Sequence, residues 1–200
     1  MTHSSEVKKS TLNLANRITI GRILLIPVFV VLILYYENAP LGEGEWIRNL
    51  AITVFGFAVL TDAVDGFIAR TMQQKTPLGT FLDPIADKLL ITSAMVILSF
   101  PHLRLGYQLP LWFIVLVISR DMIITMGALL IHILNGSVKV VPSIAGKITT
   151  GLQMACVFAI LLKSSWSPYW VYAAALATLI SGVDYILFGS RQLSGNHQQK

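Results

Sequence analysis

The sequence is poor in charge and has a single cysteine, and each shortage excludes a class of protein. Asp, Glu, Lys and Arg make up 12% of the 200 residues, whereas 54% are hydrophobic. Soluble domains carry about 25% charged residues, so this composition excludes a soluble enzyme and indicates a protein of the lipid bilayer. The one cysteine, Cys156, excludes an intramolecular disulfide and a multi-cysteine zinc site. Oxygen atoms remain as ligands for a metal ion.

A concentrated basic patch is also missing. The formal net charge is +5, but the fifteen Lys and Arg residues are spread along the chain, with no basic run interleaved with aromatic residues. We therefore expect no nucleic-acid partner. The orientation of a membrane protein explains the positive charges better.

Six apolar stretches are present, each near the length of about 17–25 residues that a membrane-spanning helix needs. They lack the two-residue alternation of barrel strands, and lipid offers backbone groups no partner outside a helix or a closed barrel, so we expect helices. The predicted fold class is an all-α integral membrane protein with six transmembrane helices, at about residues 18–36, 50–69, 80–100, 109–134, 140–162 and 166–188.

An even number of spans places both termini on one side, and Lys and Arg concentrate on the cytoplasmic side of membrane proteins. If the termini are cytoplasmic, three cations lie outside: Arg48, Arg104 and Lys163. The larger inner set is Lys8, Lys9, Arg17, Arg22, Arg70, Lys75, Lys88, Lys139, Lys147, Arg191 and Lys200. This excess predicts cytoplasmic termini.

The chain divides into three parts by composition. We expect a mobile N-terminal segment over 1–10, a single membrane domain over 11–190 and a polar tail over 191–200. A short interfacial helix at about 12–20 would lead into the first span. The alternative is that the first apolar run, preceded by Lys8 and Lys9, is a signal peptide.

Acidic residues occur where lipid would disfavour them. Six of the ten lie within or at the edge of predicted spans: Asp62, Asp65, Asp83, Asp87, Asp121 and Asp184. An Asp at the centre of a span costs about 2.5–3.5 kcal/mol, so such residues normally face a bundle interior and have a function. All but Asp121 fall in the cytoplasmic halves of their spans, which predicts a polar cavity open to the cytoplasm.

The densest group reads DAVDGFIAR from Asp62 to Arg70 and, eight residues later, GTFLDPIAD from Gly79 to Asp87. The i, i+3 and i, i+4 spacings place two carboxylates on one face of each of two helices. Gly66 and Gly79 leave room beside the carboxylates for a large ligand. Pro77 and Gly79 predict a turn between the two helices.

Four carboxylates that face one another repel unless they are protonated or neutralised by cations. Their hard oxygen ligands suit two divalent cations, Mg²⁺ or Mn²⁺, and paired metals of this kind assist displacement at phosphate. The residues alone leave two alternatives open. The carboxylates also suit a proton relay or cation pathway, or buried structural ion pairs.

This motif resembles the signature of the CDP-alcohol phosphatidyltransferases, D-x2-D-G-x2-A-R-x8-G-x3-D-x3-D. All eight fixed positions match: Asp62, Asp65, Gly66, Ala69, Arg70, Gly79, Asp83 and Asp87. The likeness extends over about residues 16–153. It implies six spans in a bacterial inner (plasma) membrane, a homodimer, and transfer of a phosphatidyl group from CDP-diacylglycerol to an alcohol, with contacts to membrane lipids.

Outlying segments resemble the family members whose acceptor is glycerol 3-phosphate. They are N-x2-T-x2-R (Asn16, Thr19, Arg22), the pair Arg120-Asp121, and S-x2-G-K-x-K-T-x2-Q, of which Ser143, Gly146, Lys147, Thr150 and Gln153 match. Thr149 stands where a second Lys is common in that last segment, which leaves the acceptor open. The alternative acceptors within the family are inositol phosphate, serine, and phosphatidylglycerol, from which the product would be cardiolipin. A cation transporter is the alternative outside the family.

The resemblance also implies roles for single residues. The metal ligands would be Asp62, Asp65, Asp83 and Asp87, and Asp87 would also be the catalytic base. The CDP-diacylglycerol site would comprise Asp62, Asp65, Gly66, Ala69, Arg70 and Gly79. The acceptor phosphate would be bound by Arg120, Lys147 and Lys139, with Asn16, Thr19 and Arg22 as accessory residues.

Purely structural roles for some of these residues are also open. Arg120 could pair with Asp121, although adjacent side chains point about 100° apart on a helix and pair poorly. Arg22 could be a cation that anchors the first span at the interface, and Asn16 and Thr19 could cap or flank that span.

Overall fold

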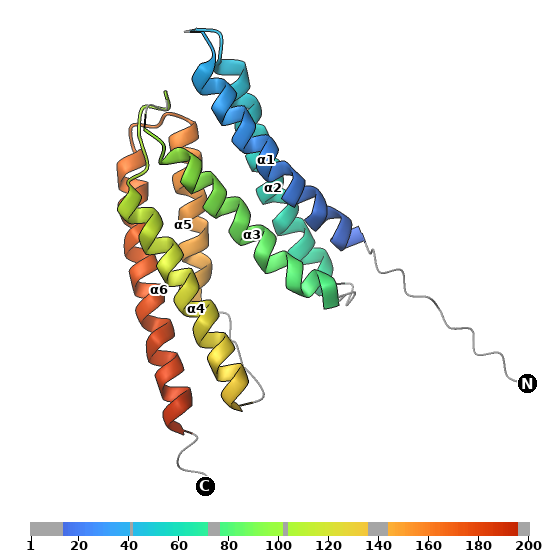
Figure 1. The fold of residues 1–200 in the computed structure, drawn as a ribbon, viewed down its shortest axis with the longest axis vertical. Coiled ribbons are helices and arrows are strands. Elements are labelled where there is room, and N and C mark those ends of the chain that lie inside the picture. The colour runs from blue at the N-terminus through green and yellow to red at the C-terminus, as the bar shows by residue number, and fades with distance from the viewer. Residues whose placement is uncertain (1–13, 41, 72–76, 102–103, 136–143, 196–200) are drawn as a thin grey trace, which may run out of the picture. The chain divides into compact units, whose positions relative to one another are not determined.

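The structure, a computed structural model, describes residues 14–40, 42–71, 77–101, 104–135 and 144–195. Side chains are described over 19–40, 42–61, 88–101, 104–127 and 144–187, and at 86. This part of the chain contains helices and no strand (Figure 1). The helices are α1 (Leu14–Asn38), α2 (Glu45–Thr71), α3 (Pro77–Leu98), α4 (Leu111–Asn135), α5 (Ile144–Leu161) and α6 (Ser167–Gly195). The prediction of an all-helical fold is confirmed.

Three helical segments among the described residues are long and apolar enough to cross a membrane: Thr19–Asn38, Ile144–Leu161 and Ser167–Leu187. Lys88–Leu98 is a shorter apolar stretch. Each of the six predicted spans overlaps one helix. Length and hydropathy identify three of the six as candidate spans among the described residues.

The segment expected to form a short interfacial helix is helical from Leu14 onward and continues without a break into the first apolar segment as part of α1. The prediction of a turn at Pro77 and Gly79 is wrong. Pro77 and Gly79 lie within α3, of which Pro77 is the first residue. The physical reason is that proline suits the first turn of a helix, where its missing N–H would have no intrahelical acceptor.

The chain divides into two compact units, Met1–Ser93 and Ala94–Lys200, with the boundary inside α3. In the first unit, α1 and α2 form an antiparallel pair (Figure 1). Gly42, with φ of 95°, lies in the connection, and the left-handed backbone there favours glycine. The buried rings of Phe29 and Phe55 meet between the two helices with centroids 5.4 Å apart.

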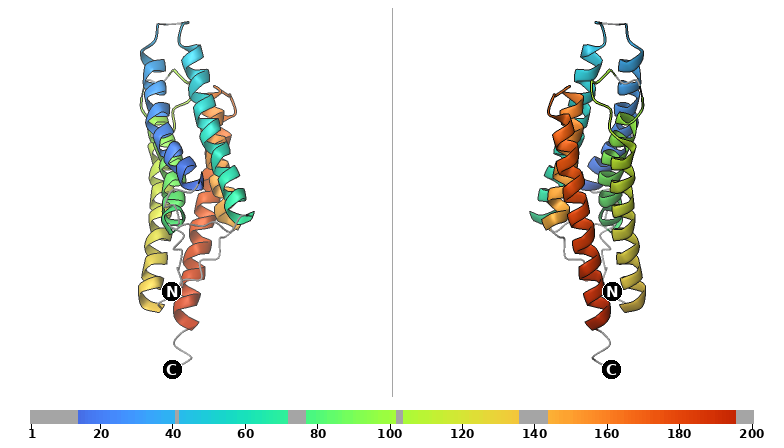
Figure 2. Two further views of the ribbon diagram at one scale, coloured as in Figure 1. Left: turned by 90° about the vertical axis from the view of Figure 1, so that its right-hand side faces the viewer. Right: turned by 90° about the vertical axis from the view of Figure 1, so that its left-hand side faces the viewer.

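In the second unit, α6 packs against both α4 and α5 (Figure 2). The turn from α5 to α6 is closed by two hydrogen bonds of 2.9 Å, from the Lys163 N–H to the Ile160 carbonyl and from the Ser164 N–H to the Ala159 carbonyl. Lys163 has φ of 54°, which completes a Schellman end to α5. The tight turn brings α6 back antiparallel to α5.

Replacing Phe55 by Ala should lower the free energy of unfolding by about 3 kcal/mol. This is the low end of the range for Phe→Ala, because lipid rather than water surrounds the unpacked helices. Phe57→Ala is the matched control, since Phe57 is 58% exposed on the same helix, and it should change stability by less than about 0.5 kcal/mol. Unfolding of the purified protein in detergent measures both; equal losses would contradict the α1–α2 packing.

Candidate active site

The eight motif residues lie on two consecutive helices. The C-terminal third of α2 carries five of them and the first half of α3 carries three. The backbone is helical at every one of these positions. The prediction that the i, i+3 and i, i+4 aspartates share a helix face requires this helical backbone. The side chains themselves lie outside the described residues: Asp62, Asp65, Gly66, Ala69, Arg70, Gly79, Asp83 and Asp87.

The motif aspartates are the residues that could hold a metal ion by their chemistry. Among the side chains that the structure describes, no three or more His, Cys, Asp or Glu form a group that could hold one. The side chains of the four motif aspartates are not among those described. Their donor chemistry fits Mg²⁺ or Mn²⁺, because both ions prefer carboxylate oxygens.

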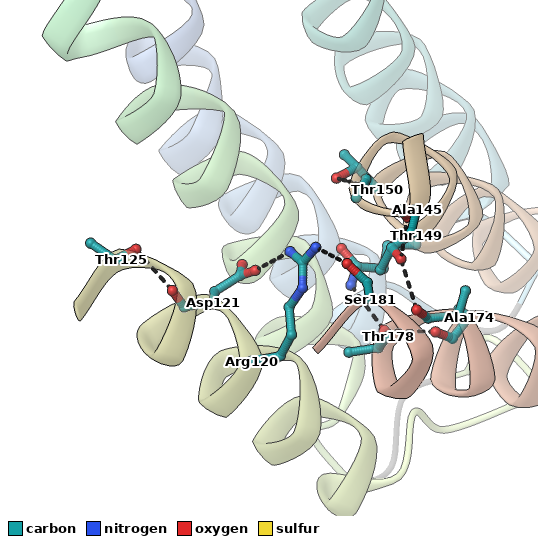
Figure 3. A network of polar contacts seen from close by, with 12 residues as sticks. Arg120, Asp121, Thr125, Ala145, Thr149, Thr150, Ala174, Thr178 and Ser181 are labelled. Atoms are coloured by element: carbon teal, nitrogen blue, oxygen red, sulfur yellow. Dashed lines mark hydrogen bonds and ion pairs between the residues drawn. The ribbon is translucent and has the colours of Figure 1, made fainter. Parts of the chain in front are cut away.

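Arg120 of α4 is bound to two neighbours in the second unit. Its Nη1 donates a 2.7 Å hydrogen bond to Oδ1 of Asp121, and its Nη2 donates one of 2.5 Å to Oγ of Ser181 on α6 (Figure 3). The expectation that Arg120 and Asp121 pair poorly is therefore wrong. The long, flexible Arg side chain brings its guanidinium to the carboxylate of the next residue despite their divergent directions on the helix.

These two bonds leave the Arg120 guanidinium with spare donors. A guanidinium has five N–H groups, and the Nε atom of Arg120 is buried without an acceptor among the described residues. The whole residue is 8% exposed. A buried donor without an acceptor costs about 1–3 kcal/mol, so an anion that reached this guanidinium would be favoured.

Two glycines leave the space that the Arg120 side chain fills. A Cβ on Gly146 of α5 would lie 3.3 Å from Arg120 Nη2, and a Cβ on Gly182 of α6 would lie 3.6 Å from Arg120 Cγ. We call the space between these glycines the Arg120 slot. It brings the guanidinium next to the first turn of α5.

That first turn carries a second cation of the predicted acceptor site. Lys147 follows Gly146 directly and is exposed. The N-terminal end of a helix also favours anions, because its first N–H groups have no intrahelical acceptor. The third predicted cation, Lys139, lies outside the described residues.

Thr149, which stands where the family commonly has a lysine, packs inside the second unit. Its hydroxyl lies 2.8 Å from the carbonyl oxygen of Ala145 and 3.0 Å from that of Ala177 on α6 (Figure 3). The side chain is fully buried. Thr149 therefore contributes to the packing of α5 against α6 in this chain, where a charged lysine would not fit without displacing α6.

Two of the three accessory residues of α1, Thr19 and Arg22, are buried. Arg22 is 1% exposed, so its interpretation as a surface cation that anchors the first span is wrong. Thr19 is also buried and lies within α1 rather than at its start, so it does not cap the helix. The side chain of Asn16 lies outside the described residues.

Sequence analysis missed Ser181, the hydrogen-bond acceptor from a third helix. The available signal was weak: Ser181 and Gly182 are adjacent small residues within an apolar run, a pattern typical of close helix packing. Nothing in the spacing along one helix indicates that a serine 61 positions later will meet Arg120.

The chain is similar to known proteins along almost its whole length. The family model described as CDP-alcohol phosphatidyltransferase matches residues 12–181. A protein of Mycobacterium tuberculosis (strain H37Rv), named probable phosphatidylglycerophosphate synthase, is 38% identical over 192 residues, which cover 93% of this chain and 86% of that protein. A Bacillus subtilis (strain 168) protein, named CDP-diacylglycerol--glycerol-3-phosphate 3-phosphatidyltransferase, is 35% identical over 186 residues, which cover 86% and 93% respectively.

The motif resemblance is therefore confirmed independently of the spacing argument. The match extends well beyond the motif, through the helices that carry Arg120, Lys147 and Ser181. With its apolar helices, the chain is an integral membrane protein, and it belongs to the CDP-alcohol phosphatidyltransferase family of enzymes.

Proposed function

We propose that this enzyme transfers the phosphatidyl group of CDP-diacylglycerol to glycerol 3-phosphate, giving phosphatidylglycerophosphate and CMP. The observation that carries the proposal is the match of relatives named for this synthesis over 86–93% of the chain. The complete eight-residue motif on α2 and α3 supports the donor half of the reaction. The buried guanidinium of Arg120 beside the first turn of α5 supports an anionic acceptor.

The donor is bound by motif residues in this proposal. Asp62, Asp65, Asp83 and Asp87 hold two divalent cations, which when bound neutralise phosphate charge and favour departure of CMP. Asp62 and Asp65, with Gly66, Ala69, Arg70 and Gly79, receive the CDP head group. Arg70 adds charge-assisted hydrogen bonds to the phosphates, and the small residues leave space for the nucleotide.

The acceptor hydroxyl is activated by Asp87. Its carboxylate takes the hydroxyl proton while the hydroxyl oxygen attacks the phosphorus that carries diacylglycerol. The bond from that phosphorus to the bridging oxygen of CMP breaks, and CMP leaves with the electron pair. The phosphatidyl group is then joined to glycerol 3-phosphate.

The acceptor phosphate is bound by Arg120, with Lys147 and Lys139. Arg suits a phosphate because its planar guanidinium presents paired N–H groups, whereas Lys acts as a point charge. The spare N–H donors of Arg120 support this role. Asp121 holds the guanidinium without neutralising Lys147, so a net positive charge remains for the dianion.

Topology and assembly complete the proposal. Six spans place both termini and the active site on the cytoplasmic side of a bacterial inner membrane, within one catalytic domain over 11–190. Acyl chains stay in the lipid, while the water-soluble acceptor arrives from the cytoplasm. Asn16, Thr19 and Arg22 act as accessory residues, and the enzyme is a homodimer.

Purified protein given radiolabelled CDP-diacylglycerol and Mg²⁺ should release CMP when glycerol 3-phosphate is added, and chelation of the metal should abolish the release. Equal amounts of phosphatidylglycerol, inositol phosphate and serine form the control panel. Release with one of these in place of glycerol 3-phosphate would overturn the acceptor assignment. Cation flux into proteoliposomes without nucleotide would instead favour a transporter.

Asp87→Asn should lower kcat by about 100-fold or more, because general base catalysis contributes roughly 10²–10⁴-fold. Asp184→Asn is the matched control: it neutralises an exposed aspartate of α6 outside the motif and should keep activity within about twofold. The CMP release assay measures both. Full activity of Asp87→Asn would rule out this residue as the base.

Arg120→Lys should raise the KM for glycerol 3-phosphate about tenfold and leave the KM for CDP-diacylglycerol unchanged. The variant keeps the positive charge but loses the paired N–H geometry that binds a phosphate. Initial rates with each substrate varied in turn measure the two constants. An unchanged KM for the acceptor would remove Arg120 from the acceptor site.

A further inference from the structure

We propose that Ser181 of α6 and Gly146 of α5 are positioning residues for the acceptor: together they hold the Arg120 guanidinium in the orientation that binds the acceptor phosphate. The inference rests on the proposed function, because it takes Arg120 as the ligand of that phosphate. It extends the acceptor site to α6, a helix to which no motif residue belongs.

The guanidinium of Arg120 is held at two of its nitrogens. An Arg side chain has many rotamers, and a group that must meet a phosphate binds better when its orientation is set in advance. Asp121 accepts from Nη1 and Ser181 accepts from Nη2, at 2.7 Å and 2.5 Å. Two acceptors at two nitrogens fix the plane of the group, which a single ion pair would leave free to turn (Figure 3).

Ser181 and Thr178, the hydroxyl residue one turn before it, both accept a hydrogen bond from a side chain of another helix, but only Ser181 has a charged donor as its partner. The Thr178 hydroxyl donates to the Ala174 carbonyl of its own helix, at 2.6 Å, as buried Ser and Thr residues in helices commonly do. It also accepts from Nε2 of Gln153 on α5, at 3.4 Å, whereas Ser181, which is 2% exposed, accepts from the charged guanidinium of Arg120 on α4, at 2.5 Å. Its hydroxyl therefore connects α6 to the guanidinium.

Gly146 borders the Arg120 slot at the end that holds the guanidinium. An added Cβ would stand 3.3 Å from Arg120 Nη2 and 4.0 Å from Ser181 Oγ. A methyl group at this position would crowd the bonded nitrogen. At Gly182 the nearest atom is the aliphatic Cγ of Arg120 at 3.6 Å, an ordinary van der Waals contact. The two glycines thus border different parts of one side chain.

Ser181→Ala removes the acceptor from Nη2 and should raise the KM for glycerol 3-phosphate about tenfold, the effect of losing one charge-assisted hydrogen bond. The kcat and the KM for CDP-diacylglycerol should stay within about twofold, a split that general damage to the fold would not give. Ser167→Ala is the matched control, because it removes another buried hydroxyl of α6, one that donates to the Ser164 carbonyl. An unchanged acceptor KM in Ser181→Ala would overturn the role of Ser181.

The glycine pair tests the slot without removing any hydrogen-bonding group. Gly146→Ala should raise the acceptor KM by at least about threefold, since small misplacements of a binding group weaken binding, whereas Gly182→Ala should leave it unchanged. Alanine favours helix over glycine at both positions, so a weakened helix would not explain a loss. Equal effects of the two substitutions would overturn the positioning role of Gly146.

A double substitution separates this inference from the proposed function. If Ser181 acts through Arg120, Ser181→Ala should add little to the raised acceptor KM of Arg120→Lys, whereas a full independent rise would overturn the inference. A raised KM in Arg120→Lys with a normal KM in both Ser181→Ala and Gly146→Ala overturns the inference and leaves the acceptor site intact. A normal KM in Arg120→Lys overturns the acceptor assignment itself.

Discussion

A charged group within a membrane protein needs partners, because lipid provides none. Arg120 meets this requirement in a way that organises the second unit: α4 supplies the guanidinium and its carboxylate, α6 supplies the hydroxyl, and a glycine of α5 makes the space. Three helices are therefore joined at one polar point within otherwise apolar packing. One donor, Nε, is nevertheless buried without an acceptor among the described residues.

The first unit is held together by apolar packing. Apolar rings at Phe29 and Phe55 hold α1 against α2, and this packing supports the helix whose last turns carry the first half of the motif. In the proposed function, the carboxylates and small residues of the motif bind the donor, whereas the buried rings hold the two helices together. The ring contact at Phe55 lies near the middle of α2 and the motif residues of this helix lie in its last third.

Composition and apolar length were sufficient to predict the helices, because lipid leaves the backbone few options. The motif was sufficient to identify the family, because its eight positions are read directly from the chain. Contacts between individual side chains were not predictable in this way. The Arg120–Asp121 pair depends on the path of a long side chain, and Ser181 meets Arg120 only because α6 packs beside α4. Pro77 was misassigned because proline suits both a turn and the first residue of a helix.

The turn at Lys163 has a mechanical consequence. Its two backbone hydrogen bonds leave almost no slack between α5 and α6, and the hydroxyl of Thr149 meets a carbonyl oxygen of α6 farther along the same pair of helices. The two helices of this hairpin are thus held together at the turn and again about three turns away from it, so the distance between Gly146 of α5 and Ser181 of α6 is set by the backbone rather than by the arginine that lies between them.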